Sequence, residues 1–169
     1  IGAPISKAVF ERLQELADLE AAHRAALRAL ARRAHARFDL RRRLLQKQHP
    51  PAAVVGALDG LAAAALLDDG RFAADYAAAK AYRGRGPARL IRDLLALGID
   101  RRVAEQAVQT SLADEGIDPT RAVRALAEKR ARQLAALPAS VRKRRLTAFL
   151  VRRGFAGAEV RKVVDSLAF

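Results

Sequence analysis

The strongest constraint on the fold is an internal repeat, in which the same apolar positions return about every fifty residues. The segment LRRRLLQKQH (40–49) aligns with LIRDLLALGI (90–99) and with LTAFLVRRGF (146–155). Its leucines coincide at 40, 90 and 146 and again at 44, 94 and 150. The next segment keeps this register: Val54, Ala57, Leu58 and Leu61 match Ala104, Ala107, Val108 and Ser111, and then Val160, Val163, Val164 and Leu167. A repeat of this length indicates stacked supersecondary units that need their neighbours for stability.

The residues inside each repeat are typical of helices. Ala, Leu, Arg and Glu dominate, and β-branched residues are sparse. Turn residues interrupt the chain at 50–51, 68–70, 84–87, 98, 116–119, 138–140 and 154–157. We therefore expect an all-α chain of roughly ten helices of about ten to twenty residues. It would consist of an N-terminal extension (1–18) and three tandem three-helix repeats (19–67, 68–117 and 118–169), stacked into an elongated, curved, solenoid-like chain.

The charge is strongly positive and unevenly distributed. The formal net charge is +14, and 26 of the 32 basic residues are Arg. The first repeat has nine basic and three acidic residues, the second has eight of each, and the third has thirteen and four. This pattern favours a polyanionic or acidic partner that meets the two outer repeats.

The composition also limits where such a chain acts. It contains no Cys, which excludes disulfides and thiolate metal sites and fits a reducing, cytoplasmic setting. Its longest charge-free stretch, residues 48–58, is far shorter than the roughly 20 apolar residues of a membrane span. The chain begins with Ile and has no Met, so we expect the native start to lie upstream.

Nothing in the sequence indicates an enzyme. The adjacent Asp68 and Asp69 precede a helix predicted to run to about Tyr82, where a helix N-cap explains them without acid–base chemistry. Phe72 and Tyr76, four residues apart, are expected to anchor the core of that helix. The GRGP segment (84–87) lacks the further glycine and the preceding strand of a phosphate loop, and is interpreted as a flexible turn with Pro87 in the first helical position. The three His residues are too scattered for a metal site, and no cofactor is expected.

Clusters of basic residues on equivalent helices predict a binding surface. We expect no direct base reading, because Asn is absent and few Gln stand beside the arginines. Contact with phosphates or with an acidic protein surface fits better. The candidate partner-binding residues are Arg37, Arg41, Arg42, Arg43, Lys47, Arg83, Arg85, Arg89, Arg92, Arg142, Lys143, Arg144, Arg145, Arg152 and Arg153.

The segment LLDDGRFAADYAAAKAYRGRGPARLIRDLLALGI (66–99) resembles the signature block of the RecX family of regulatory proteins. The matching motif positions are Asp68, Asp69, Arg71, Phe72, Ala73, Tyr76, Gly84, Gly86, Pro87, Arg89, Leu94, Gly98 and Ile99. RRLTAFLVRRGF (144–155) is similar to the last repeat of the family, and the resemblance extends over about residues 20–169. The first unit departs from the pattern, because its second helix ends in QHPP (48–51) where the third unit has a Gly-aromatic ending.

This resemblance implies a regulator of the RecA recombinase. Members of the family bind the RecA–DNA filament in its helical groove and suppress its ATPase, strand-exchange and coprotease activities. The implied role is negative regulation of homologous recombination and of the SOS response, within DNA repair and recombination. We expect a monomer. The alternative is a sequence-independent nucleic-acid-binding helical repeat protein, and whether DNA is contacted directly stays open.

Overall fold

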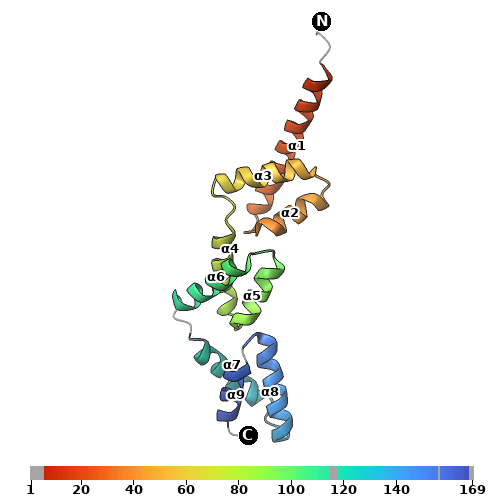
Figure 1. Cartoon of the computed structure of the whole chain (residues 1–169). Helices are drawn as coiled ribbons and strands as arrows, with labels where there is room; N and C mark the ends of the chain where they lie inside the picture. The colour runs from red at the N-terminus through yellow and green to blue at the C-terminus, as the bar shows by residue number, and fades with distance from the viewer. Residues whose placement is uncertain (1–5, 115–117, 156, 168–169) are drawn as a thin grey trace. The chain divides into compact units, whose positions relative to one another are not determined.

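The computed structural model describes residues 6–114, 118–155 and 157–167, and every regular element in these ranges is an α-helix (Figure 1). The nine described helices are α1 (Lys7–Leu30), α2 (Arg37–Gln46), α3 (Pro51–Ala63), α4 (Asp69–Ala81), α5 (Pro87–Ala96), α6 (Arg101–Asp114), α7 (Pro119–Gln133), α8 (Ala139–Arg153) and α9 (Gly157–Ser166). Among the described residues, no helix is both long and apolar enough to cross a membrane. We call α1–α3, α4–α6 and α7–α9 the first, second and third modules.

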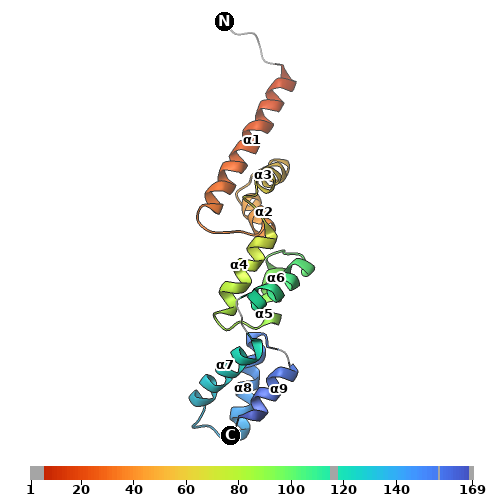
Figure 2. The same cartoon turned by 90° about the vertical axis from the view of Figure 1, so that its left-hand side faces the viewer.

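The chain divides into two compact units, the first ending at Phe72 and the second beginning at Ala73. In the first unit, α1 packs against α2 and α3, and its N-terminal part extends beyond both (Figures 1 and 2). The exposed side chains of Phe10 and Leu13 lie on this extension. The predicted boundary between residues 18 and 19 falls inside this 24-residue helix. The second unit holds nearly all of the second module and the whole described part of the third.

The apolar residues that define the repeat form the module cores. The leucines at 40, 90 and 146 are fully buried, and those at 44, 94 and 150 are at most 2% exposed. In the first module this stripe packs with Val54, Leu58 and Leu61 of α3, and in the third with Val160, Val163 and Val164 of α9. Burial of one Leu or Val side chain stabilises a fold by about 1.5–3 kcal/mol, so each small module depends on a few such residues.

Helices begin and end close to the proline and glycine residues that predicted their limits. Pro51, Pro87 and Pro119 each stand in the first position of a helix, where a missing N–H costs nothing. Gly98 and Gly154 follow the second helices of their modules with φ of +81° and +93°. Gln48 holds the equivalent position in the first module with φ of +63°. The backbone turn is thus preserved even where the sequence departs from the family pattern.

The structure also differs from the sequence prediction in two places. The described residues form nine helices, close to the roughly ten expected, but the break between α1 and α2 at residues 31–36 contains neither Gly nor Pro. In α4, the predicted core anchors Phe72 and Tyr76 are only half-buried, and the buried face consists of Ala73, Ala77 and Ala81. The buried Ser111 of α6 donates a hydrogen bond from Oγ to the carbonyl of Ala74 in α4 (3.1 Å).

Candidate partner-binding surfaces

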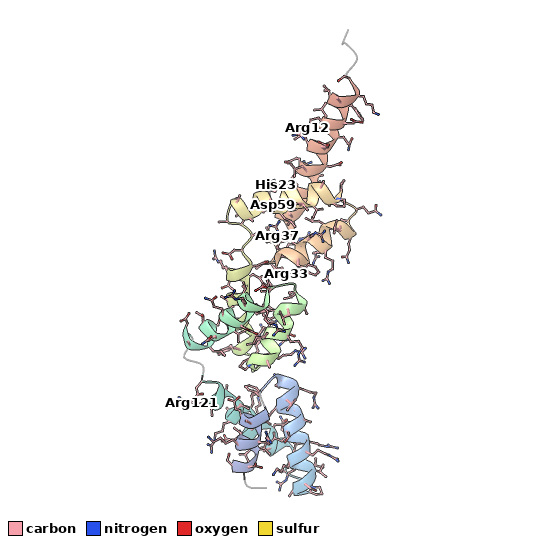
Figure 3. The ribbon with its side chains drawn as sticks, in the orientation of Figure 1. Arg12, His23, Arg33, Arg37, Asp59 and Arg121 are labelled. Carbon is pink, nitrogen blue, oxygen red and sulfur yellow. The ribbon has the colours of Figure 1, made fainter. Side chains whose placement is uncertain are left out.

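Two of the five predicted binding residues on and beside α2 are engaged within the first unit. The Arg37 guanidinium donates to Asp59 Oδ1 (2.5 Å) and to the carbonyl of Leu58 (3.4 Å), so it ties α2 to α3 (Figure 3). Arg42 pairs with Asp39 at 3.1 Å. The other three, Arg41, Arg43 and Lys47, are exposed, and their side chains form no hydrogen bond or ion pair with any described residue. These three are available to a partner.

A buried carboxylate organises the start of α2. Asp39 is 6% exposed and accepts from His35 Nδ1 (2.8 Å), Arg33 (3.2 Å) and Arg42 (3.1 Å). Burial acts to raise the pKa of Asp39, but the hydrogen bonds and positive charges of His35 and Arg33 outweigh it, so the pKa is lowered. The carboxylate is therefore held in its charged form at neutral pH.

In the second module, two of the four predicted arginines are held internally. Arg85 and Arg89 both pair with the half-buried Asp93 of α5, Arg89 at 2.9 Å. Arg85 also donates to the hydroxyl of Tyr76 (3.2 Å). Burial and the charge of Asp93 raise the pKa of that hydroxyl. The remaining arginines, Arg83 and Arg92, are exposed.

The third module also presents exposed cations. Arg144, Arg145 and Arg152 of α8 are exposed, and their side chains pair with no described residue. In contrast, Lys143 pairs with Asp165 of α9 at 2.6 Å, and Arg142 is half-buried. The Arg153 guanidinium lies over the ring of Phe149, 5.2 Å from its centroid, and donates to the carbonyl of Arg83 (3.2 Å). Among the predicted residues of α8, Arg144, Arg145 and Arg152 are therefore the ones available to a partner.

The motif acids Asp68 and Asp69 are helix caps, but they cap different helices. Asp68 Oδ1 accepts from the N–H of Arg71 (3.0 Å), as expected for the N-cap of α4. Asp69 Oδ1 accepts from the N–H of Arg37 (2.7 Å), 32 residues away at the start of α2. The expectation that Asp69 caps its own helix is therefore wrong. The first residue before α2 is Ala36, which has no side-chain acceptor, so the next module supplies one.

The motif glycines form a tight junction between the second and third modules. The N–H groups of Gly86 and Ala88 donate to the carbonyls of Arg153 (2.8 Å) and Gly154 (3.2 Å). The amino end of α5, with its partial positive charge, thus meets the carboxyl end of α8. A Cβ on Gly86 would lie 2.5 Å from backbone atoms of Gly154. The turn of Gly84 to Pro87 is accordingly a packing surface, and Gly84 itself lies against Leu126 of α7.

Two basic residues that line a depression, Arg28 and Arg32, were not among the predicted binding residues. Arg28 of α1 and Arg32 just after it lie beside Arg43 and Lys47 around one depression in the first unit. Residues 28 and 43 are fifteen positions apart, and their proximity follows from the packing of α1 against α2. Only the i, i+4 spacing of Arg28 and Arg32 and of Arg43 and Lys47 gave a local signal.

Family models described as the first, second and third three-helix domains of RecX match residues 22–61, 68–108 and 118–164. A protein named Regulatory protein RecX from Halorhodospira halophila is 39% identical over 143 residues, which cover 84% of this chain and 85% of the relative. The protein of the same name from Pseudomonas savastanoi pv. phaseolicola is 35% identical over 136 residues, covering 80% and 84%.

Two solved structures share the fold. The crystal structure of RecX from Lactobacillus salivarius has a TM-score of 0.77 at 20% identity, over 90% of this chain and 97% of that chain. A crystal structure titled regulatory protein RecX has a TM-score of 0.80 at 20% identity, over 98% of this chain and 80% of that chain.

Proposed function

Because the chain belongs to the RecX family of regulatory proteins, we propose that it regulates the RecA recombinase by binding the RecA–DNA filament. In this role it lowers the ATPase, strand-exchange and coprotease activities of the filament, and so acts as a negative regulator of recombination and of the SOS response. It acts in the cytoplasm as a monomer, without a cofactor and without chemistry of its own. We also propose that its three repeats begin at residues 19, 68 and 118.

The distribution of uncompensated cations supports this proposal. Exposed and unpaired basic side chains lie on the equivalent helices α2 and α8, at Arg41, Arg43, Arg145 and Arg152 among others. In the second module, Asp93 instead holds two of the four candidate arginines. An anionic filament would therefore be attached mainly through the first and third modules.

The DNA-dependent ATPase of RecA tests the proposal directly. We expect inhibition at ratios well below one molecule of this protein per RecA, because one molecule bound to a filament affects many subunits. Inhibition that appears only when the protein saturates the DNA would contradict filament binding. That outcome would instead favour simple competition for DNA by a sequence-independent nucleic-acid-binding protein, the alternative supported by the same exposed arginines.

A matched pair of charge reversals tests where the filament is bound. Reversing Arg145 and Arg152 to Glu should weaken filament binding strongly and reduce its salt dependence, because phosphate-type contacts are lost. Reversing Arg101 and Arg102 changes the net charge by the same amount but lies in the neutral second module, where Arg101 already pairs with Glu105 (3.2 Å). Equal losses in titrations at several salt concentrations would refute attachment through the outer modules.

A further inference from the structure

A depression in the first unit is surrounded by cations from two helices. Its volume is about 290 Å³, and it lies between the carboxyl end of α1 and the last turn of α2. Ala25, Ala29 and His35 line it, and basic side chains surround it. The basic residues are Arg28, Arg32, Arg33, Arg43 and Lys47. No carboxylate is among the lining residues.

Four of these five cations have no counterion among the residues that the structure describes. Arg33 pairs with Asp39 at 3.2 Å and donates to the carbonyl of Ala34 (3.1 Å). The side chains of the other four form no hydrogen bond or ion pair with any described residue. Asp39, the acid closest along the chain, is already shared among His35, Arg33 and Arg42. The depression therefore has an uncompensated positive charge.

The spacing of these cations destabilises the protein when no anion is present. Arg28 and Arg32 are four residues apart, and so are Arg43 and Lys47. Like charges this close along the chain repel each other, and Arg32 and Lys47 stand just beyond the ends of α1 and α2. The carboxyl ends of α1 and α2 offset part of this repulsion, because a helix carries a partial negative charge at that end. The two helix dipoles thus offset part of the repulsion between the cations. An anion bound in the depression would offset the rest.

The chemistry of the rim identifies the kind of anion. Arg presents planar N–H groups that match the oxygens of phosphate in pairs, and Lys adds a compact point charge. The volume is at the lower end of small-molecule sites, about 300–1,000 Å³, and those sites are mostly apolar, unlike this one. We propose that this depression is a phosphate-binding site, formed by Arg28, Arg32, Arg43 and Lys47, that holds the phosphate groups of a polynucleotide or of a free polyphosphate. The proposal deepens the nucleic-acid-binding alternative given above by assigning it a site, and it does not depend on a recombinase.

The test compares two double variants of the whole chain without RecA. Arg32→Gln with Lys47→Gln removes two cations from the rim. Arg12→Gln with Arg24→Gln removes two from the same unit whose charges are already balanced, by Glu15 at 2.9 Å and Glu20 at 3.4 Å (Figure 3 labels Arg12). The readouts are the affinity for a labelled single-stranded oligonucleotide at several salt concentrations, and the thermal shift caused by inorganic pyrophosphate.

We expect the rim variant to bind the oligonucleotide about tenfold less tightly, with a salt slope lower by about 1.4, since each phosphate contact on a single strand contributes about 0.7. The balanced variant should keep both values. Pyrophosphate that stabilises wild type but not the rim variant identifies free phosphate as a second ligand, whereas loss of oligonucleotide binding alone assigns the site to the polynucleotide. Equal behaviour of the two variants in both assays overturns the proposal.

Folding of the rim variant is tested by the same melts. Removal of one member of each like-charged pair should leave its unliganded melting temperature equal to that of wild type or slightly higher. A lower melting temperature would mean that the rim cations stabilise the unliganded protein, and that result also overturns the proposal. Because RecA is absent from every arm, inhibition of RecA can fail while this site stands, and the reverse is equally true.

Discussion

Replacing Gly86 with alanine should open the junction between the second and third modules while leaving each module folded. Gly86 has φ of −78° and ψ of 161°, a conformation that any residue adopts, so the substitution brings no backbone strain. Its new Cβ would lie 2.5 Å from the carbonyl carbon and oxygen of Gly154. Ordinary contacts of such atoms are about 3.5 Å, and both partners are backbone. The two chains must therefore move apart by about 1 Å.

The cost follows from the hydrogen bonds that this movement breaks. The N–H of Gly86 donates to Arg153 at 2.8 Å, that of Ala88 to Gly154 at 3.2 Å, and the Arg153 guanidinium to the carbonyl of Arg83 at 3.2 Å. Each bond contributes about 1 kcal/mol net, so the junction loses roughly 2–3 kcal/mol. Since 1.4 kcal/mol is a factor of ten, amide hydrogen exchange at positions 86 and 88 should accelerate roughly 30- to 150-fold.

A matched glycine provides the control. Gly60 lies in α3, and beyond the local backbone of that helix a Cβ there would meet no described atom within 4 Å. Gly60→Ala should stabilise the first unit by about 0.5–1 kcal/mol, because glycine is a poor helix former, and should leave exchange at position 88 unchanged. Protection at positions 86 and 88 that survives in Gly86→Ala, or that is lost equally in Gly60→Ala, would refute a junction closed by glycine-to-backbone packing.

Two further predictions concern the acids of the first unit. Asp69→Ala should lower the free energy of unfolding of this unit by about 1 kcal/mol, because the N–H of Arg37 loses its cap. A thermal melt measures this loss. Full stability together with lost RecA inhibition would instead make Asp69 a contact residue. Asp39→Asn should destabilise the same unit by about 2–3 kcal/mol at neutral pH. Because the folded pKa of Asp39 is lowered, its charged form stabilises the fold above about pH 4, and that stabilisation disappears as the pH falls through the folded pKa. Urea titrations between pH 7 and pH 3 should therefore show a loss in wild type that is smaller in the variant.

The sequence predicted those parts of the fold that rest on local pattern. In each second helix, the first leucine (40, 90 or 146) and the leucine four residues later indicate which face is buried, because i, i+4 neighbours share a face. Proline and glycine indicate where helices begin and end, because proline fixes φ and lacks an N–H, whereas glycine readily adopts the left-handed conformation at a helix end. The α1–α2 break has no such residue, and Gln48 adopts a positive φ without being glycine. Neither feature has a local signal in the sequence.

The candidate surfaces were predicted less completely, because a sequence does not show which charges neutralise each other. Arg37, Arg85 and Arg89 belong to basic clusters, yet each is paired with an aspartate inside its own module. The depression in the first unit joins Arg28 to Arg43, which only the packing of α1 on α2 brings together. Helical periodicity predicts which face of a helix is exposed. Which side chains meet across two helices depends on how the helices pack.

The second helices of the first two modules begin in the same register but are completed by different chemistry. The first amide of α2 is capped by the carboxylate of Asp69, a side chain at the start of the next module. The equivalent end of α5 is capped by backbone carbonyls at the end of α8. A carboxylate on a rotatable side chain tolerates small displacements, whereas two glycine backbones in contact do not. The start of the second helix is therefore capped in two ways, by the adjustable side chain of Asp69 in the first module and by the rigid backbone of Arg153 and Gly154 in the second.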